Sequence, residues 1–205
     1  MWSRPAVLSS LLAAVPLALT VLGSGAARAQ EAPAPAAAAN PFGRKYPARV
    51  YETRRLEGKP PRIDGRLDDD AWKLGDWAGG FTQQIPTEGA PPSQTTELKI
   101  LYDDRNVYFA IRAHDDPAKV HRYPGRRDAF SGDIVGVCFD SYNSKQAGFE
   151  FDLTAGGSKI DLILGNGETE WDTTWDPVWD GKVAHDEQGW TAEFRVPLNQ
   201  LRFGP

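Results

Sequence analysis

Apolar and polar residues alternate along several short segments between residues 96 and 198. Residues 106–113, NVYFAIRA, show the pattern clearly, because Val107, Phe109 and Ile111 occupy every second position. Side chains two positions apart on a strand point to the same face, so this period predicts a strand with one buried face. The same reasoning predicts further strands at residues 96–102, 133–140, 148–154, 158–164 and 189–198.

Turn-forming residues separate these segments, as in DDRN at 103–106, Gly156-Gly157 and DEQG at 186–189. Asp, Asn and Gly tolerate the backbone of tight turns, so neighbouring strands can pair as hairpins. The pattern therefore predicts an all-β fold, an antiparallel β-sandwich. We expect one helix of about two turns at LDDDAWKLG, residues 67–75, which starts with acidic residues and ends at a glycine.

The N-terminal part has the features of an export signal. Residues 1–29 carry an early arginine, a short apolar run broken by Pro16, and ARA at 27–29, which predicts cleavage after Ala29. The alternative is a membrane anchor, but the apolar run is short and no basic cluster follows it. Residues 30–45 are Pro/Ala-rich and predict an extended linker, so we assign the folded domain to residues 46–205. We expect an exported protein of the periplasm or outer membrane, or an extracellular one.

Charge and cysteine content narrow the functional classes. The net charge is −5, and removal of Arg4 and Arg28 with the signal gives −5 − 2 = −7, because the signal contains no acidic residue. That charge argues against nucleic acid as a partner. Cys138 is the only cysteine, so an intramolecular disulfide is excluded, and its place in a predicted strand suggests a small packing residue.

Acidic residues crowd residues 168–180, and three interpretations are open. The stretch could be a solvated loop, a calcium site, or part of a glycoside hydrolase centre, which needs two carboxyl groups about 5–10 Å apart. The carboxylates concerned are Glu168, Glu170, Asp172, Asp176 and Asp180. Three histidines lie far apart without metal-ligand spacing, and we expect them at the surface: His114, His121 and His185.

Three tryptophans spaced by four residues lie in the same stretch, WDTTWDPVWDG. Pro177 argues against a helix there. We expect Trp179 to enter the core from an extended segment and Trp171, nearer the polar loop, to be exposed. An exposed indole beside acids suits a sugar ring, whose C–H face it stacks on, or a protein interface.

Four stretches follow one another in the order known from one family: PRIDGRLDDDAW, LYDDRNVYFAIRAHDDP, DAFSGDIVGVCFD and GWTAEFRVPLNQLRF. Together they resemble the family 9 carbohydrate-binding module over about residues 50–205. The resemblance implies an immunoglobulin-like β-sandwich that binds reducing-end sugars between two aromatic rings. Members often hold structural calcium and are attached to xylanases and similar enzymes. Three short motifs, RRD, WD..W and LRF, are similar to those of a second group of proteins. In that group the module precedes an outer-membrane-type barrel of unknown function.

The resemblance carries over to few site residues. Phe130 and Asp133 match an aromatic residue and the aspartate that opens a D-x-V-E-x-F strand in sugar-binding members, but Gly136 replaces the glutamate. Glu150 stands where those members have an arginine. Their second aromatic residue comes from strands beyond this chain's end, so Trp171 or Trp175 would substitute for it.

These observations predict an exported, non-catalytic module that binds a poly- or oligosaccharide and is tied to carbohydrate catabolism. The stacking residues would be Phe130 and Trp171, with Trp175 as a second candidate, and the polar contacts Arg127 and Glu150. Structural calcium is a further expectation. The alternative is an interaction domain of an outer-membrane barrel without sugar binding, and a glycoside hydrolase comes third. Relatives continue beyond LNQLRFGP, so we expect this chain to be a truncated piece of a longer protein that includes a barrel or a hydrolase.

Overall fold

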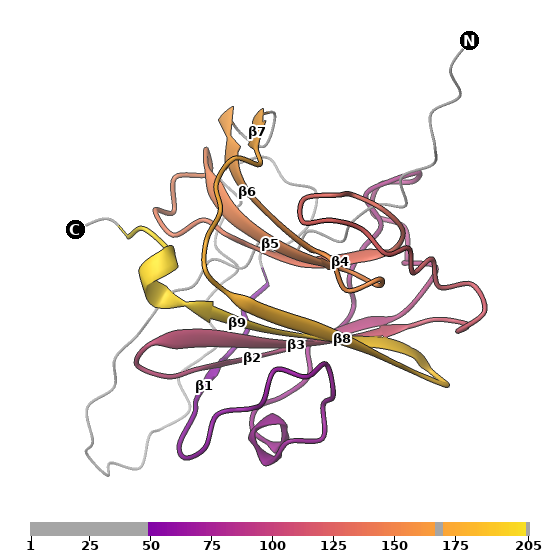
Figure 1. The fold of residues 1–205 in the computed structure, drawn as a ribbon, viewed down its shortest axis with the longest axis horizontal. Coiled ribbons are helices and arrows are strands. Elements are labelled where there is room, and N and C mark those ends of the chain that lie inside the picture. Colours follow the sequence, from indigo (N-terminus) through magenta and orange to yellow (C-terminus); the bar gives the residue numbers. More distant parts are fainter. Residues whose placement is uncertain (1–48, 167–169, 204–205) are drawn as a thin grey trace, which may run out of the picture.

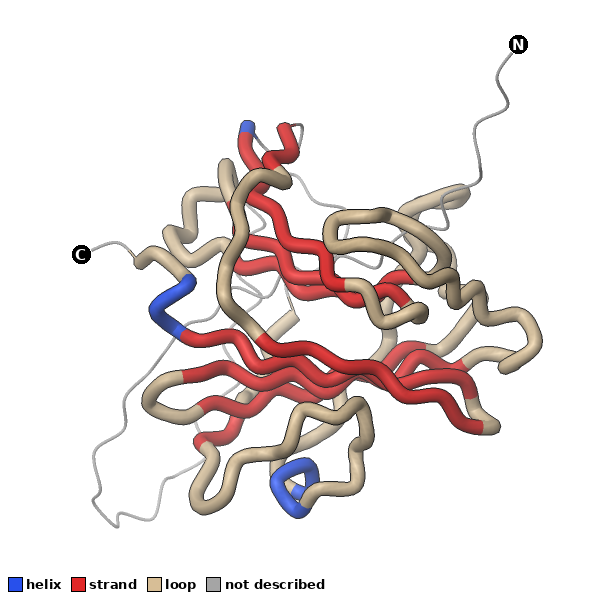
Figure 2. Tube along the Cα trace, viewed as in Figure 1, coloured by secondary structure: helices blue, strands red, loops and turns tan. Residues whose placement is uncertain are grey.

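The protein folds as two β-sheets that face each other (Figures 1 and 2). The structure, a computed structural model, describes residues 49–166 and 170–203. The predicted signal and linker lie outside these residues. The five-stranded sheet has the order β1 (Arg54–Arg55), β2 (Thr96–Tyr102), β3 (Asn106–His114), β9 (Gly189–Pro197) and β8 (Asp180–Asp186). The four-stranded sheet has the order β4 (Ile134–Phe139), β5 (Gly148–Thr154), β6 (Lys159–Gly165) and β7 (Glu170–Asp172).

All the pairings between these strands are antiparallel except that of β1 with β2. The predicted all-β, antiparallel sandwich is therefore confirmed. The hairpins form where turn residues were found, at 103–105, 155–158 and 187–188.

The predicted two-turn helix at 67–75 is wrong. Only one 3₁₀ turn forms there, η1 (Asp70–Lys73), and a second short one, η3 (Leu198–Gln200), follows β9. Asp69 gives η1 no side-chain cap, while Ala71 and Trp72 are buried against the five-stranded sheet, so packing holds this segment in place of a longer helix. None of the described helices is long and apolar enough to cross a membrane.

Aromatic side chains from both sheets fill the space between them. Trp179 is 3% exposed, and its ring lies flat on that of Phe194, with centroids 5.7 Å apart. Phe151 of the other sheet meets Trp179 edge-on at 5.4 Å. Trp179 is thus a core residue, as the sequence predicted, and it joins the two sheets.

The segment before β2 covers the outer face of the five-stranded sheet, which explains why two distant sequence motifs occur together. Trp72 of η1 donates its indole N–H to a carboxylate oxygen of Glu193 on β9, at 2.7 Å. The other oxygen of Glu193 accepts the backbone N–H groups of Asp64 and Gly65. The stretches PRIDGRLDDDAW, residues 61–72, and GWTAE, residues 189–193, therefore supply the two sides of one buried hydrogen-bonded contact.

The four-stranded sheet is also buried on its outer face near the middle. All seven residues of β5 are buried, including Glu150 and Asp152, although alternation alone indicates a single buried face. The outer face carries a second apolar cluster formed by Cys138, Ile160, Leu162 and Leu164. Cys138 is a small packing residue there, as expected.

Candidate functional site

Two exposed aromatic rings lie against each other at the outer face of the four-stranded sheet. Phe130, in the loop before β4, is 46% exposed, and Trp171 on β7 is 63% exposed. Their ring centroids are 6.0 Å apart and their planes are inclined by 28°. Trp171 is opposite Leu164 in the pairing of β6 with β7, so it shares the outer face with Leu164. We call Phe130 and Trp171 the ring pair.

The loop that carries Phe130 is tied to the edge of β6. The Ser158 hydroxyl donates to the Gly125 carbonyl at 2.9 Å, and the Asp128 N–H donates to the Lys159 carbonyl at 2.9 Å. The Asp161 N–H in turn donates to Oδ1 of Asp128 at 3.2 Å. These bonds lie where β7 does not pair with β6, so the loop uses the free edge and then reaches Trp171.

The two rings are too close to hold a sugar between them in this conformation. Stacked groups need about 3.5–4 Å on each side, so a sandwiched pyranose requires rings roughly 7–8 Å apart. The observed separation is 6.0 Å. A sugar can stack on the outward face of one ring, or it can enter after the rings separate.

Arg127 anchors the loop. Its guanidinium donates to Asp161 at 2.5 Å and to the Pro177 carbonyl at 3.0 Å, and it lies 2.8 Å from Asp176. Asp161 is opposite Phe151 on the inward side of β6. Burial opposes the charged form of Arg127, but the hydrogen bond and charge of Asp161 outweigh it, so the pKa of Arg127 is raised.

Two carboxyl groups lie side by side on the outer face of β5. Glu150 is 6% exposed and Asp152 is 2% exposed. Burial, and then the charge and hydrogen bond of Glu150, raise the pKa of Asp152 well above its ordinary value. Gly136 lies opposite Asp152 on β4, and a Cβ there would be 1.6 Å from Oδ1 of Asp152. The glycine therefore makes room for the carboxyl group.

Comparison with known proteins identifies the family. A family model described as "Carbohydrate family 9 binding domain-like" matches residues 63–202, more than half of the chain. The chain belongs to this family. No curated protein matches it.

Solved structures show the same fold at low sequence identity. A family 9 module of Caldicellulosiruptor kristjanssonii in complex with glucose is 16% identical, with a TM-score of 0.52 over 75% of this chain and 71% of that chain. The same organism's module with cellotriose is 16% identical, with a TM-score of 0.50 over 71% and 67%. A candidate carbohydrate-binding protein of Bacteroides uniformis is 10% identical, with a TM-score of 0.53 over 75% of each chain.

Of the predicted site residues, this family 9 domain brings together Phe130 and Trp171. Trp175 does not join them, because its ring packs on the inward side of the sheet. Its centroid lies 5.0 Å from that of Phe149 and 5.4 Å from that of Phe151. Glu150 is on the outer face but buried, and Arg127 has charged partners. Asp152 had no assigned role, since a carboxylate at an alternating strand position is expected to be solvated.

The acidic side chains of the stretch 168–180 have different partners in the family 9 domain. Asp172 accepts hydrogen bonds from Thr174, Asp176 pairs with Arg127, and Asp180 pairs with Arg195. Within the described residues, no three His, Cys, Asp or Glu side chains gather where they could hold a metal ion. Glu168 lies outside the described residues. Structural calcium therefore stays a prediction.

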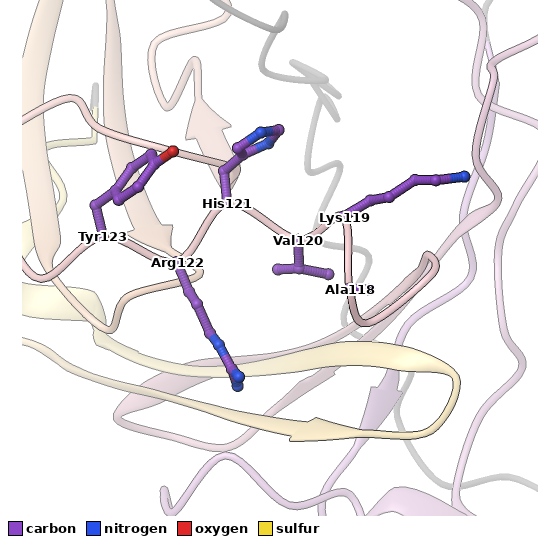
Figure 3. Close-up of a pocket in the computed structure, with 6 residues that line it drawn as sticks. All are labelled: Ala118, Lys119, Val120, His121, Arg122 and Tyr123. Atoms are coloured by element: carbon purple, nitrogen blue, oxygen red, sulfur yellow. The ribbon is translucent and has the colours of Figure 1, made fainter.

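A shallow pocket adjoins the start of the Phe130 loop, lined by residues 118–123 (Figure 3). The His121 and Tyr123 rings lie on one side with centroids 6.1 Å apart, while Arg122 points the other way. His121 lies 3.6 Å from Asp133, which also accepts its backbone N–H. Tyr123 is 55% exposed and is a further aromatic surface on the same loop.

Proposed function

We propose that this family 9 domain is a non-catalytic module that binds saccharides at the ring pair of Phe130 and Trp171. The observation that carries the proposal is a pair of large, solvent-exposed rings from two different elements, brought together at 6.0 Å. Exposed aromatic side chains offer sugars an apolar face for C–H contacts. Family membership and similar folds solved with glucose and cellotriose support a sugar as the ligand.

Isothermal titration calorimetry with glucose and cellotriose tests this proposal. We expect measurable binding by the wild-type chain and at least a tenfold loss for Phe130→Ala and for Trp171→Ala. Tyr142→Ala is the matched control, because Tyr142 is 49% exposed but outside the ring pair, and it should bind as the wild type does. Binding that survives both ring substitutions, or a folded chain that binds no saccharide, would refute the proposal.

We infer that the module works outside the cytoplasm, joined to a carbohydrate-degrading enzyme or an outer-membrane barrel and serving carbohydrate catabolism. The signal-like residues 1–29 support export. N-terminal sequencing of the protein from an exporting host should begin at Gln30, and a cytoplasmic chain that keeps residues 1–29 would contradict this. Any hydrolysis would then belong to the attached part, so a reducing-sugar assay on this chain alone should stay at background.

We also propose that calcium stabilises the fold, which family members of this kind suggest. Thermal unfolding with excess calcium and with EDTA is the test. If the unfolding temperature is the same with calcium and with EDTA, calcium does not stabilise this module.

A further inference from the structure

The two segments that carry the ring pair meet at a second point. Arg127 comes three residues before Phe130 in the sequence. Its guanidinium donates to the Pro177 carbonyl at 3.0 Å and lies 2.8 Å from Asp176. Both partners belong to the segment that leaves β7 after Trp171 and crosses to β8 in the other sheet (Figure 1). The Phe130 loop and this segment are therefore joined twice, once by the rings and once by Arg127.

The core holds Arg127 in this position. Its guanidinium donates to Oδ1 of Asp161 at 2.5 Å, and the same oxygen accepts the indole N–H of Trp179 at 2.9 Å. Asp161 is fully buried, whereas the side chain of Asp176 is 74% exposed. An exposed ion pair contributes little, but a buried carboxyl group that loses its charged partner is costly. The bond to Asp161 therefore fixes Arg127, and Arg127 in turn fixes the segment after β7.

Backbone hydrogen bonds hold the Phe130 loop on both sides of the ring. Before the ring, the Asp128 N–H donates to the Lys159 carbonyl at 2.9 Å. After it, the Asp133 N–H donates to the His121 carbonyl, also at 2.9 Å. Only residues 129–132 lie between these two anchors. We therefore expect the rings to stay near their 6.0 Å separation when a sugar binds, because separating them would break bonds of the loop or of Arg127.

A closed ring pair contacts a sugar from one side. Rings 6.0 Å apart leave no room for a pyranose between them. The ligand then lies on the exposed surface of the pair, to which Phe130 contributes at 46% exposure and Trp171 at 63%. A sugar that stacks there is contacted through one face of its ring, so the glycosidic bonds on both of its sides can continue into solvent.

We propose that this module binds internal units of a longer saccharide chain on the exposed surface of the closed ring pair, and that Arg127 is the positioning residue that keeps the pair closed. The inference rests on the proposed saccharide binding at the ring pair. It departs from the binding of reducing ends between two rings that the family resemblance implies. Arg127 acts through the two segments that it joins, and the rings contact the sugar.

Borohydride-reduced cellohexaose makes the experiment selective, because its reducing-end ring is opened to an alditol while its internal units are unchanged. Calorimetry on the wild-type chain compares this sugar with cellohexaose. We expect the two affinities to agree within about twofold, since neither end of the chain is held. A site that encloses the reducing-end ring would instead lose about tenfold or more in affinity for the reduced sugar.

Arg127→Gln tests the positioning role, because it removes the charged partner of Asp161. We expect the affinity for both sugars to fall by about fivefold with their ratio unchanged. In a chain that also carries Trp171→Ala, Arg127→Gln should cause no further loss, whereas a direct contact of Arg127 with the sugar would add one. Affinity electrophoresis in hydroxyethylcellulose detects the weak binding of these variants. Arg195→Gln is the matched control, because Arg195 pairs with Asp180 on the five-stranded sheet, and it should bind as the wild type does.

Circular dichroism establishes that each variant is folded, and the comparison of the two sugars uses the wild type alone. A loss of about tenfold on reduction of cellohexaose would refute the inference and leave the proposed function standing. Wild-type affinity in Arg127→Gln, or an additional loss in the double variant, would overturn the positioning role. Absence of binding to both sugars would remove the inference and the proposed function together.

Discussion

Glu193 is fully buried, and its hydrogen bond to Trp72 joins two residues 121 positions apart in the sequence. Trp72→Phe removes the indole N–H and leaves one oxygen of Glu193 without its donor. We expect the free energy of unfolding to fall by about 1–3 kcal/mol, the usual cost of a buried polar group that loses its partner. Urea unfolding of the variant measures the change.

Trp77→Phe is the control for that measurement. Trp77 is 40% exposed, and its ring interacts with the Lys99 ammonium group through its face, which phenylalanine retains in part. Its substitution should change the free energy of unfolding by well under 1 kcal/mol. Equal losses in the two variants would mean that the contact between Trp72 and Glu193 contributes nothing particular to stability.

The same carboxyl group makes stability depend on pH. Burial raises the pKa of Glu193 from an ordinary value of 4.5 to about 7, although three N–H donors oppose the rise. Between these two values the folded state keeps a proton that the unfolded state has released. This group's contribution to stability therefore declines as the pH rises from 4.5 to 7 and is constant above that range. Glu193→Gln should lack this component, so unfolding of both proteins at several pH values should give a difference that varies with pH. A constant difference would contradict the prediction.

At the scale of elements, the loop that carries Phe130 depends on the β5–β6 turn. A Cβ on Gly156 would lie 2.0 Å from the Tyr123 carbonyl oxygen, so Gly156→Ala must push the loop away. We expect a loss of about 1–3 kcal/mol of stability, typical of overpacking, and weaker cellotriose binding because Phe130 moves relative to Trp171.

Gly79→Ala is the matched control, because a Cβ at Gly79 has its nearest neighbour at 3.6 Å, an ordinary contact. That variant should keep both its stability and its affinity. If Gly156→Ala lowers stability but leaves cellotriose affinity intact, the loop position does not govern the site.

The sequence predicted the longer strands well because their signal is local. Residues 96–102 and 148–154 match β2 and β5, since a period of two between turn residues fixes both ends. It missed β1 and β7, with two and three residues, which are too short to show a period. The helix expected at 67–75 was wrong because packing of Trp72 on the five-stranded sheet overrides local propensity.

The candidate site was predicted in part, for a related reason. Phe130 was predicted from the family resemblance and Trp171 from its position beside a polar loop, and both rings are exposed. Trp175 is followed by an aspartate as Trp171 is, and only the tertiary fold places it against Phe149 and Phe151. The burial of Glu150 and Asp152 could not be predicted, because the alternation in this strand indicates a single buried face.

At the scale of the whole molecule, the two sheets share one core and should unfold together. Phe194 of the five-stranded sheet is fully buried. Its ring centroid lies 6.3 Å from that of Phe109 and 5.7 Å from that of Trp179. Trp179 contacts Phe151 of the four-stranded sheet in turn. Removal of the Phe194 ring therefore leaves a cavity next to the residue that joins the sheets.

We expect Phe194→Ala to lower the free energy of unfolding by about 3–5 kcal/mol, the usual range for a buried aromatic residue. Tryptophan fluorescence and far-ultraviolet circular dichroism should give coincident urea transitions in both wild type and variant, because the largest core cluster is shared by the two sheets. Phe203→Ala, which removes an exposed ring near the end of the described chain, is the control and should change stability little. Two separate transitions in the wild type would show that the sheets unfold independently and that the aromatic contacts across the sandwich do not couple them.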